Sequence, residues 1–302
     1  MSTFAVGTVA PSQTLSLILE PTMITAALVS AGTYKSHMPT WKMAVLGMLG
    51  GLYVGLGGQV FVALLSGVDS AAGPVRYLAG TGFSFALVMI VICGAELFTG
   101  NCLLILSVLS GQTTLLEMLW DWFVVYFSNF AGCIFTAVIV FGGGINGYPT
   151  TGTNMTATGT TICKIAVAKA HLQPHEMFFR GILANICVCL SIMCAISAKS
   201  AVGKVFVIIM PIAAFVTSSY EHSIANMFMF SSATLLNCDG LGGHGWYWIN
   251  LVLCTLGNIL GALILGIAYW ATNLPHGEPT APDATTATVA AADVAPKLHA
   301  HD

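Results

Sequence analysis

Long apolar stretches occupy most of the chain between residues 41 and 271, separated by glycine, proline and charged residues. Four of them, at about 41–65, 115–144, 177–198 and 246–271, have the ~20 residues that one bilayer-spanning helix needs. Two others, at about 76–110 and 205–236, contain polar residues near their middle, and the first is too long for one simple crossing. The pattern predicts an all-α polytopic membrane protein with six transmembrane spans, of which the second and the fifth are broken.

Three further segments have no spanning pattern. We expect no cleaved signal in the N-terminal segment, 1–40, whose residues 15–34 suit either a helix on the membrane surface or an ordinary helix packed on the bundle. Residues 145–172 form the longest internal connection, and we expect them to fold over one mouth of the six-span domain, 41–272. The tail, 273–302, is rich in Ala, Thr and Pro without an apolar period, which predicts disorder.

The composition supports a membrane protein and narrows its chemistry. Hydrophobic residues make up 56% of the chain and charged residues 7%, and the mean hydropathy is +0.86, which excludes an ordinary soluble protein. The net charge of −3 comes from few charges, so we expect no nucleic-acid partner. The nine cysteines lack CxxC spacing, which predicts small buried hydrophobic residues and neither a disulfide framework nor a zinc site. Five cysteines lie clearly within apolar spans: Cys93, Cys133, Cys187, Cys189 and Cys194.

Two short patterns recur in the same order in each half of the chain. Glu96 to Asn101 and Glu221 to Asn226 both read Glu-x-x-x-x-Asn, at an offset of 125 residues. Asn-x-x-Gly occurs at 129–132 and again at 258–261, at an offset of 129 residues. Halves of three spans each, about 41–144 and 177–271, must cross the bilayer in opposite senses. The sequence therefore predicts an inverted repeat, in which paired broken helices meet near the membrane midplane.

The polar cluster at 220–226 interrupts the fifth span. A charged group in apolar surroundings costs several kcal/mol unless it is satisfied locally, so such a cluster marks function by default. We expect Glu96 and Glu221 to be structural, accepting hydrogen bonds from backbone N–H groups that the helix breaks set free. A lone histidine is usually structural too, but the position of His222 in the repeat favours a role in a transport path.

Other classes of function have less support. Glu221-His222 lacks the second histidine of HExxH, and Gly-x-Ser-x-Gly does not occur. We therefore expect no enzyme activity, no metal and no cofactor. A structural or sensing membrane protein is the other alternative, and failure to move any small weak acid in liposomes would favour it.

Several motifs together resemble one known family. They are Cys-Gly-Ala-Glu-Leu-Phe-Thr-Gly-Asn at 93–101, Tyr-Phe-Ser-Asn at 126–129, Gly-Ile-Leu-Ala-Asn at 181–185 with Cys-Val-Cys-Leu at 187–190, and Tyr-Glu-His-Ser-Ile-Ala-Asn-Met-Phe-Met at 220–229. In this order they resemble the formate-nitrite transporter family, across about 35–272. The resemblance implies an aquaporin-like fold and a homopentamer with one path in each protomer. Aquaporins themselves carry Asn-Pro-Ala at both breaks, and this chain has no Asn-Pro dipeptide.

The resemblance also implies roles for individual residues. At the centre of the path it places His222, facing Leu97, Phe98 and Thr99 on the first break, with Asn185 and Asn226 as polar neighbours. Apolar constrictions are implied at Phe83, Leu87 and Phe215 on one side of that centre and at Leu97 on the other. Lys169 matches a lysine near the outer vestibule that attracts anions. Glu96, Asn101 and Glu221 match structural residues at the helix breaks.

The implied function is transport of small monovalent anions, formate and nitrite, across a lipid bilayer. A proton that neutralises the anion lowers its desolvation cost, so His222 either relays that proton, as in proton symport, or only orders the anion in a channel. The alternatives within the family are a lactate or short monocarboxylate carrier coupled to protons and a hydrosulfide channel. Five basic residues against four predict cytoplasmic termini in a plasma, inner or organelle membrane.

Overall fold

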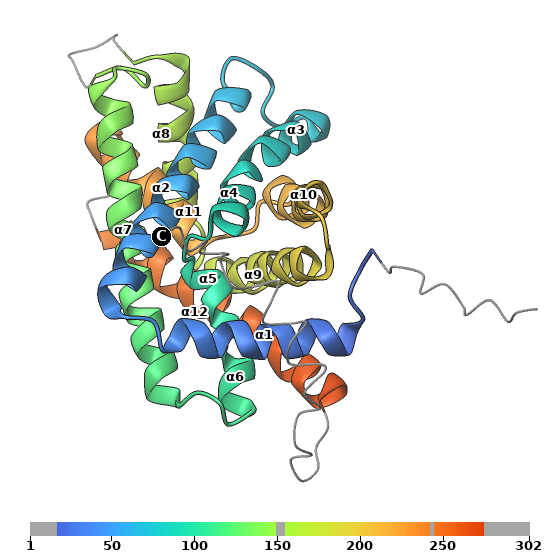
Figure 1. Ribbon diagram of the computed structural model, residues 1–302. Helices are drawn as coiled ribbons and strands as arrows, with labels where there is room; N and C mark the ends of the chain where they lie inside the picture. Colours follow the sequence, from blue (N-terminus) through green and yellow to red (C-terminus); the bar gives the residue numbers. More distant parts are fainter. Residues whose placement is uncertain (1–16, 149–154, 242–244, 275–302) are drawn as a thin grey trace, which may run out of the picture.

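The described residues, 17–148, 155–241 and 245–274 of the computed structural model, form helices and contain no strand (Figure 1). The first 16 residues and the tail after 274 lie outside this part. The predicted disorder of the tail therefore concerns residues that the structure does not describe. The helices in chain order are α1 Pro21–Ser36, α2 Thr40–Leu65, α3 Gly73–Phe83, α4 Phe85–Cys93, α5 Phe98–Asn101, the 3-10 turn η1 Cys102–Leu104, α6 Ile105–Leu109, α7 Leu115–Gly142, α8 Ala157–Ala170, α9 Pro174–Ser197, α10 Ala201–Thr217, α11 Ser223–Leu235 and α12 Gly245–Asn273.

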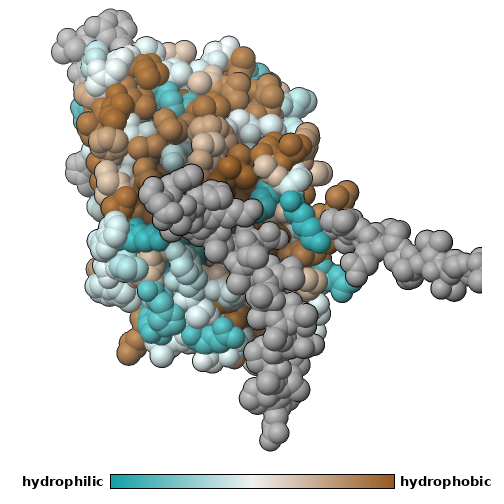
Figure 2. All heavy atoms as spheres, viewed as in Figure 1, coloured by the Kyte–Doolittle hydropathy of each residue, from teal (hydrophilic) through white to brown (hydrophobic). Residues whose placement is uncertain are grey.

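Five helical stretches in the described part are long and apolar enough to cross a bilayer. They are Thr40–Leu65, Gly73–Cys93, Leu115–Gly142, Pro174–Ser197 and Gly245–Asn273. Two shorter apolar stretches, Phe98–Leu109 and Ala201–Thr217, adjoin the helix breaks. Figure 2 shows hydrophobic residues gathered over the face formed by α2, α3 and α10, and more hydrophilic residues toward α1 and α6. The prediction of an all-helical protein with several membrane spans is confirmed.

Each of the two spans predicted to be broken leaves the helical conformation near its middle. In the first, α4 ends at Cys93, where Gly94 adopts a left-handed φ of 77° that suits glycine, and Leu97 is extended before α5 begins. The second break follows α10, with Ser219 at φ 58° and His222 extended before α11 begins. Both breaks therefore expose a helix N-terminus inside the bundle.

Capping residues account for several helix starts. The Thr114 hydroxyl oxygen accepts the Glu117 N–H at 3.2 Å, and the Glu117 carboxylate accepts the Thr114 N–H at 2.8 Å, which is a complete capping box for α7. The Thr156 hydroxyl oxygen caps α8 by accepting the Gly159 N–H at 3.2 Å. At α11 the capping residue is His222, which uses a ring nitrogen in place of an oxygen.

Glycines bring the long helices into close contact. A Cβ atom at Gly132 of α7 would collide with the Met48 carbonyl oxygen of α2. At the matching position of the second half, a Cβ atom at Gly261 of α12 would collide with the Ile182 carbonyl oxygen of α9. Small residues at such positions let two helix backbones approach in a membrane, where burial of apolar side chains gains little.

Helix α1 runs across the long helices in Figure 1 and packs against them. Its buried residues include Leu28, Val29 and Gly32, and the Ser107 hydroxyl donates to the Val29 carbonyl at 2.7 Å. At the far end of the chain, the Asn273 amide of α12 donates to the Thr25 hydroxyl at 3.1 Å. Of the two interpretations of 15–34, these contacts favour the helix packed on the bundle.

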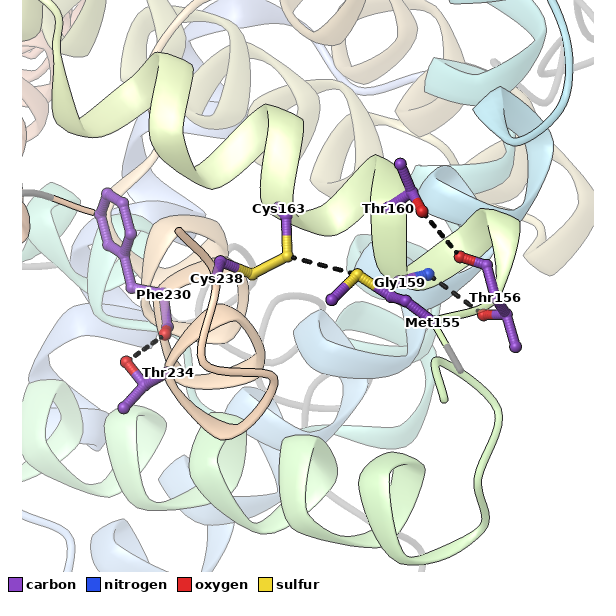
Figure 3. The surroundings of a disulfide bond; sticks show 8 residues. All are labelled: Met155, Thr156, Gly159, Thr160, Cys163, Phe230, Thr234 and Cys238. Atoms are coloured by element: carbon purple, nitrogen blue, oxygen red, sulfur yellow. Dashed lines mark hydrogen bonds between the residues drawn. A yellow bond between two sulfur atoms is a disulfide. The ribbon is translucent and has the colours of Figure 1, made fainter. Parts of the chain in front are cut away.

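Cys163 of α8 and Cys238, which follows α11, form a disulfide (Figure 3). The prediction that the cysteines form no disulfide is therefore wrong. The two residues lie 75 positions apart, outside the long spans, and only the fold brings α8 against the end of α11. Two of the five cysteines expected to be buried, Cys93 and Cys194, are exposed instead.

Candidate functional site

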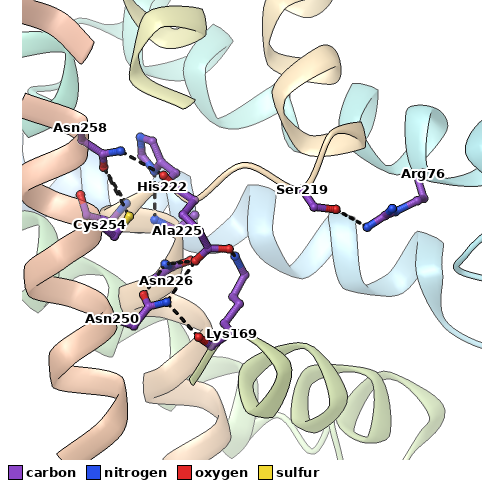
Figure 4. A network of polar contacts seen from close by, with 11 residues as sticks. Arg76, Lys169, Ser219, His222, Ala225, Asn226, Asn250, Cys254 and Asn258 are labelled. Atoms are coloured by element: carbon purple, nitrogen blue, oxygen red, sulfur yellow. Dashed lines mark hydrogen bonds and ion pairs between the residues drawn. The ribbon is translucent and has the colours of Figure 1, made fainter. Parts of the chain in front are cut away.

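His222 joins the two helix breaks. Its Nδ1 accepts the Ala225 N–H at 3.1 Å (Figure 4), and its Nε2 lies 2.9 Å from the Thr99 hydroxyl oxygen. Thr99 belongs to α5, which begins at the first break, so this contact connects one break to the other. The His222 side chain is buried, and its ring lies against the Phe215 ring with 6.0 Å between centroids.

The hydrogen bonds determine where the ring carries its proton. Because Nδ1 accepts a backbone N–H, the single proton of a neutral His222 must be on Nε2. Nε2 then donates to the Thr99 hydroxyl oxygen, which leaves the Thr99 hydroxyl hydrogen available to another acceptor. A second proton on the ring would occupy Nδ1 and displace the cap on Ala225. Proton uptake at His222 is thus coupled to the start of α11.

A cavity of about 330 Å³ reaches His222 from one end of the protein. Helix α8 contributes to its wall, together with α3, α10, α11 and the second break. The charged residues that line it are Arg76, Lys169, Arg180 and Glu221, and three of these four are basic. The cavity is therefore suited to collect anions close to a buried imidazole.

A second space of about 20 Å³, the volume of roughly one water molecule, lies beyond His222. Its wall contains all four predicted constriction residues: Phe83, Leu87, Leu97 and Phe215. Phe83, Phe215 and His222 line both spaces, and the rings of Phe83 and Phe215 meet edge to face at 5.9 Å. The two rings therefore form a narrow apolar section beside the imidazole.

Polar side chains satisfy the acid at the first break. Lys35 Nζ of α1 donates to the Glu96 carboxylate and to the Asn101 side-chain oxygen, both at 2.8 Å. The Asn101 amide donates to Glu96 and to Asp121 of α7, again at 2.8 Å each. These residues form a buried network that holds α1, α5 and α7 together.

The second break carries the same network from equivalent positions. Lys169 Nζ of α8 donates to the Glu221 carboxylate at 2.6 Å, and the Asn226 amide donates to Glu221 at 2.8 Å. The Asn226 amide also donates to Asn250 of α12 at 2.8 Å, where the first network has Asp121. Lys169 is therefore paired with an acid, although it also lines the cavity.

Two asparagines hold the backbone of the breaks. The Asn129 side-chain oxygen accepts the Phe98 N–H at 2.9 Å, and its amide donates to the Gly47 and Glu96 carbonyls at 2.6 and 2.9 Å. Asn258 makes the equivalent contacts with the Ser223 N–H at 2.9 Å and with the Gly181 and Glu221 carbonyls at 2.8 and 3.0 Å. One amide side chain thus satisfies both a donor and an acceptor of each break.

This arrangement corrects one prediction. Glu96 and Glu221 were expected to accept backbone N–H groups at the breaks, but their carboxylates bind lysine and asparagine side chains. The free N–H groups at the helix starts are bound by Asn129 and Asn258 instead. A carboxylate has no donor for the neighbouring carbonyls, whereas an amide offers both functions.

The other predicted site residues lie at different distances from the cavity. Asn226 lines the cavity, with its amide bound in the network. Asn185 lines neither space, and its amide donates to the Thr99 and Asn258 carbonyls at 3.1 and 2.7 Å. Phe98 lines neither space and packs edge to face on Tyr126 at 4.9 Å. Asn185 and Phe98 thus contribute to the first break, and their place along the path stays a prediction.

Sequence reasoning missed several residues that the fold brings to these places. Lys35 precedes Gly47 by the same 12 residues that separate Lys169 from Gly181, so the repeat contained a signal for it. Arg76 and Arg180 line the cavity, but along the sequence they resemble ordinary flanking charges of a membrane span. Asp121 and Asn250 each lie eight residues before the asparagine that clamps the break of their half, but they differ in residue type, so the repeat did not single them out.

A helical membrane protein with two facing helix breaks and a cavity that ends between them has the architecture of a channel or transporter. The sequence profile of the formate/nitrite transporter family matches residues 22–271, most of the chain. The chain therefore belongs to the formate/nitrite transporter family.

Individual relatives agree with this assignment. The formate channel FocA of Escherichia coli (strain K12) is 29% identical over 283 residues, covering 86% of this chain and 96% of FocA. The nitrite transporter NirC of the same strain is 32% identical over 241 residues, covering 77% of this chain and 84% of NirC. A solved structure described as a pentameric formate channel with formate bound superposes with a TM-score of 0.64 at 29% identity, over 78% of this chain and 98% of the other.

Proposed function

We propose that the protein moves formate and nitrite across a membrane along a path that passes His222. The observation that carries this proposal is the contact between His222 and Thr99, which joins the two breaks where a cavity rich in basic residues ends. The family assignment and the names of the relatives support the choice of substrate.

The cost of desolvating a charge is the basis of the proposed mechanism. A bare anion is costly between the rings of Phe83 and Phe215, and protonation removes most of that cost. In the proposed relay, a hydronium ion in the cavity gives a proton to Nδ1 of His222 and becomes water, and the Nε2 proton then passes to an oxygen of the anion. The products are a neutral acid and a neutral imidazole with its proton on Nδ1, and proton exchange with water returns the ring to the form that is protonated on Nε2. In the alternative, His222 stays neutral and orders the anion through its Nε2–H.

Uptake by proteoliposomes tests the role of His222. We expect His222→Phe to abolish or greatly reduce proton-linked uptake of formate and nitrite between about pH 5 and pH 8, while the oligomer stays intact. The exposed His175, at the start of α9, provides the control variant His175→Phe, which should transport normally. Unchanged flux through His222→Phe at every pH would rule out the relay. Competition by hydrosulfide, acetate and lactate in the same assay identifies the preferred substrate.

We further propose six spans in two inverted halves, assembled as a homopentamer. The equivalent networks at Glu96 and Glu221, and the equivalent clamps at Asn129 and Asn258, support the repeat. The related channel described as pentameric supports the assembly. Native mass spectrometry of the purified protein should give five copies, and a monomer or dimer would contradict this part of the proposal.

The position of the disulfide supports a proposal for how the protein is oriented in the membrane. Disulfides persist in oxidising compartments, so the end with Cys163 and Cys238 is proposed to face outward. Helix α12 has 29 residues, about 44 Å, and runs from the segment after Cys238 to Asn273, which contacts α1. The α1 end then faces the cytoplasm, as the basic residues predict, and the cavity opens outward. Labelling by a membrane-impermeant thiol reagent after reduction of intact cells tests this orientation.

A further inference from the structure

The basic residues of the cavity differ in whether their charge is balanced. Lys169 pairs with Glu221 at 2.6 Å, and Arg180 pairs with Glu176 at 2.8 Å. Arg76 lines the same cavity, yet no carboxylate of the described residues forms an ion pair with it. The net positive charge of the cavity therefore resides at Arg76.

Arg76 lies close to the break that carries His222. It belongs to the second turn of α3, and its Nη2 donates to the Ser219 hydroxyl oxygen on the loop between α10 and α11 (Figure 4). Ser219 precedes His222 by three residues and also lines the cavity. A guanidinium has five N–H donors, and this is the one side-chain hydrogen bond that Arg76 makes within the described part of the chain. Most of its donors are available to a ligand.

We propose that Arg76, with Ser219, forms a docking subsite in the outer cavity for planar anions with two oxygens, such as a small carboxylate or nitrite. The proposal rests on the proposed function, and it names the place where the anion binds before it reaches His222. A planar guanidinium can donate two parallel N–H bonds to the two oxygens of one anion. Hydrosulfide has a single acceptor atom, so it cannot accept two parallel N–H bonds on separate atoms. Arg76 thus contributes to selectivity as well as to attraction.

Two substitutions separate the charge of Arg76 from its shape. Arg76→Gln removes the charge, and we expect the half-saturation concentration for formate to rise roughly tenfold with little change in the maximal rate. The ionic-strength dependence of uptake at low formate should weaken in the same variant. Arg76→Lys keeps a point charge, so it should retain the ionic-strength dependence but lose much of the preference for formate over hydrosulfide.

The matched control removes one positive charge from outside the cavity. Lys164 is an exposed residue of α8 that does not line the cavity, so Lys164→Gln should keep the half-saturation concentration of the unaltered protein. An unchanged value in Arg76→Gln, or an equal rise in the control, overturns the subsite while leaving the proposed function intact. If the unaltered protein moves no formate or nitrite, the proposed function fails and the subsite with it. Size-exclusion chromatography establishes that each variant keeps its oligomeric state.

Discussion

Glu221 is a buried carboxylate whose charge is balanced within one hydrogen-bond network. It is 2% exposed and accepts from Lys169 and Asn226. Removal of one partner from a buried ion pair leaves an uncompensated charge, which is more harmful than removal of both. Lys169 therefore has two effects that act together: it adds positive charge to the cavity, and it neutralises an acid beside the path.

The variant Lys169→Ala should transport more slowly. We expect weaker uptake of formate at low concentration, with less sensitivity to ionic strength, because the unpaired Glu221 carboxylate repels anions from the cavity. Initial uptake rates in proteoliposomes at two salt concentrations measure both effects. A second change, Glu221→Gln, should restore much of the uptake to Lys169→Ala. No recovery in the double variant would mean that Lys169 acts on the anion directly.

The Thr99 hydroxyl is the partner that holds His222 against the first break. Thr99→Val keeps the volume and removes the oxygen that lies 2.9 Å from Nε2, so the buried N–H loses its acceptor. We expect a large loss of uptake, with the melting temperature only slightly lower because the Ala225 cap remains. Thr99→Ser, which keeps the hydroxyl, should retain most of the activity. Equal loss in both variants would contradict a role for the hydrogen bond.

At the scale of helices, close glycine contacts align the two halves around the breaks. Gly132 and Gly261 lie three residues after Asn129 and Asn258, so the asparagine that clamps a break and the glycine that admits the neighbouring helix share one turn. This explains why Asn-x-x-Gly recurs at corresponding places. Packing and the clamp are parts of the same helix contact.

Gly261→Ala should destabilise this contact. The added methyl group meets the Ile182 carbonyl oxygen, and overpacking of this kind costs about 1–3 kcal/mol. We expect a lower melting temperature in detergent, measured by scanning fluorimetry. Gly142→Ala at the end of α7 is the control, because no atom lies within 4 Å of its added Cβ and its melting temperature should be unchanged. Equal melting temperatures for both variants would show that α9 and α12 can separate freely.

At the scale of the whole molecule, helix α8 is the element that closes the cavity on one side. It carries Lys169 near its end and Cys163 near its middle. The disulfide ties it to the segment after α11, and the His171 ring nitrogen lies 2.7 Å from the Gly240 carbonyl oxygen of the same segment. These two attachments keep Lys169 within reach of Glu221.

Loss of the disulfide should lower thermal stability. Closing a loop of 75 residues is worth at most about 4.5 kcal/mol through the entropy of the unfolded chain. We expect the double variant Cys163→Ser with Cys238→Ser to melt at a lower temperature than the unaltered protein and to be insensitive to reductant. The variant Cys194→Ser, which replaces an exposed free cysteine, is the control. Its melting temperature should still fall when reductant is added. Identical melting of all three proteins would contradict a stabilising role.

Properties that depend on residues near each other in sequence were predictable. Apolar runs predicted the membrane spans, and polar residues inside two of them predicted the helix breaks, since unpaired backbone groups are not tolerated in lipid without local partners. The recurrence of Glu-x-x-x-x-Asn directed attention to His222. The family resemblance implied constrictions at Phe83, Leu87, Leu97 and Phe215, which the structure gathers around one small space.

Properties that depend on packing between distant segments needed the tertiary structure. Apolar periodicity reports burial but not partners, so it could not join Cys163 to Cys238 or pair Lys35 with Glu96. For the same reason the sequence could not show that Glu221 balances the charge of Lys169, whereas no described carboxylate balances the charge of Arg76. Hydropathy and short motifs act over a few residues and therefore determined the spans and their breaks. The electrostatics of the cavity arise across helices, so only the folded chain decided them.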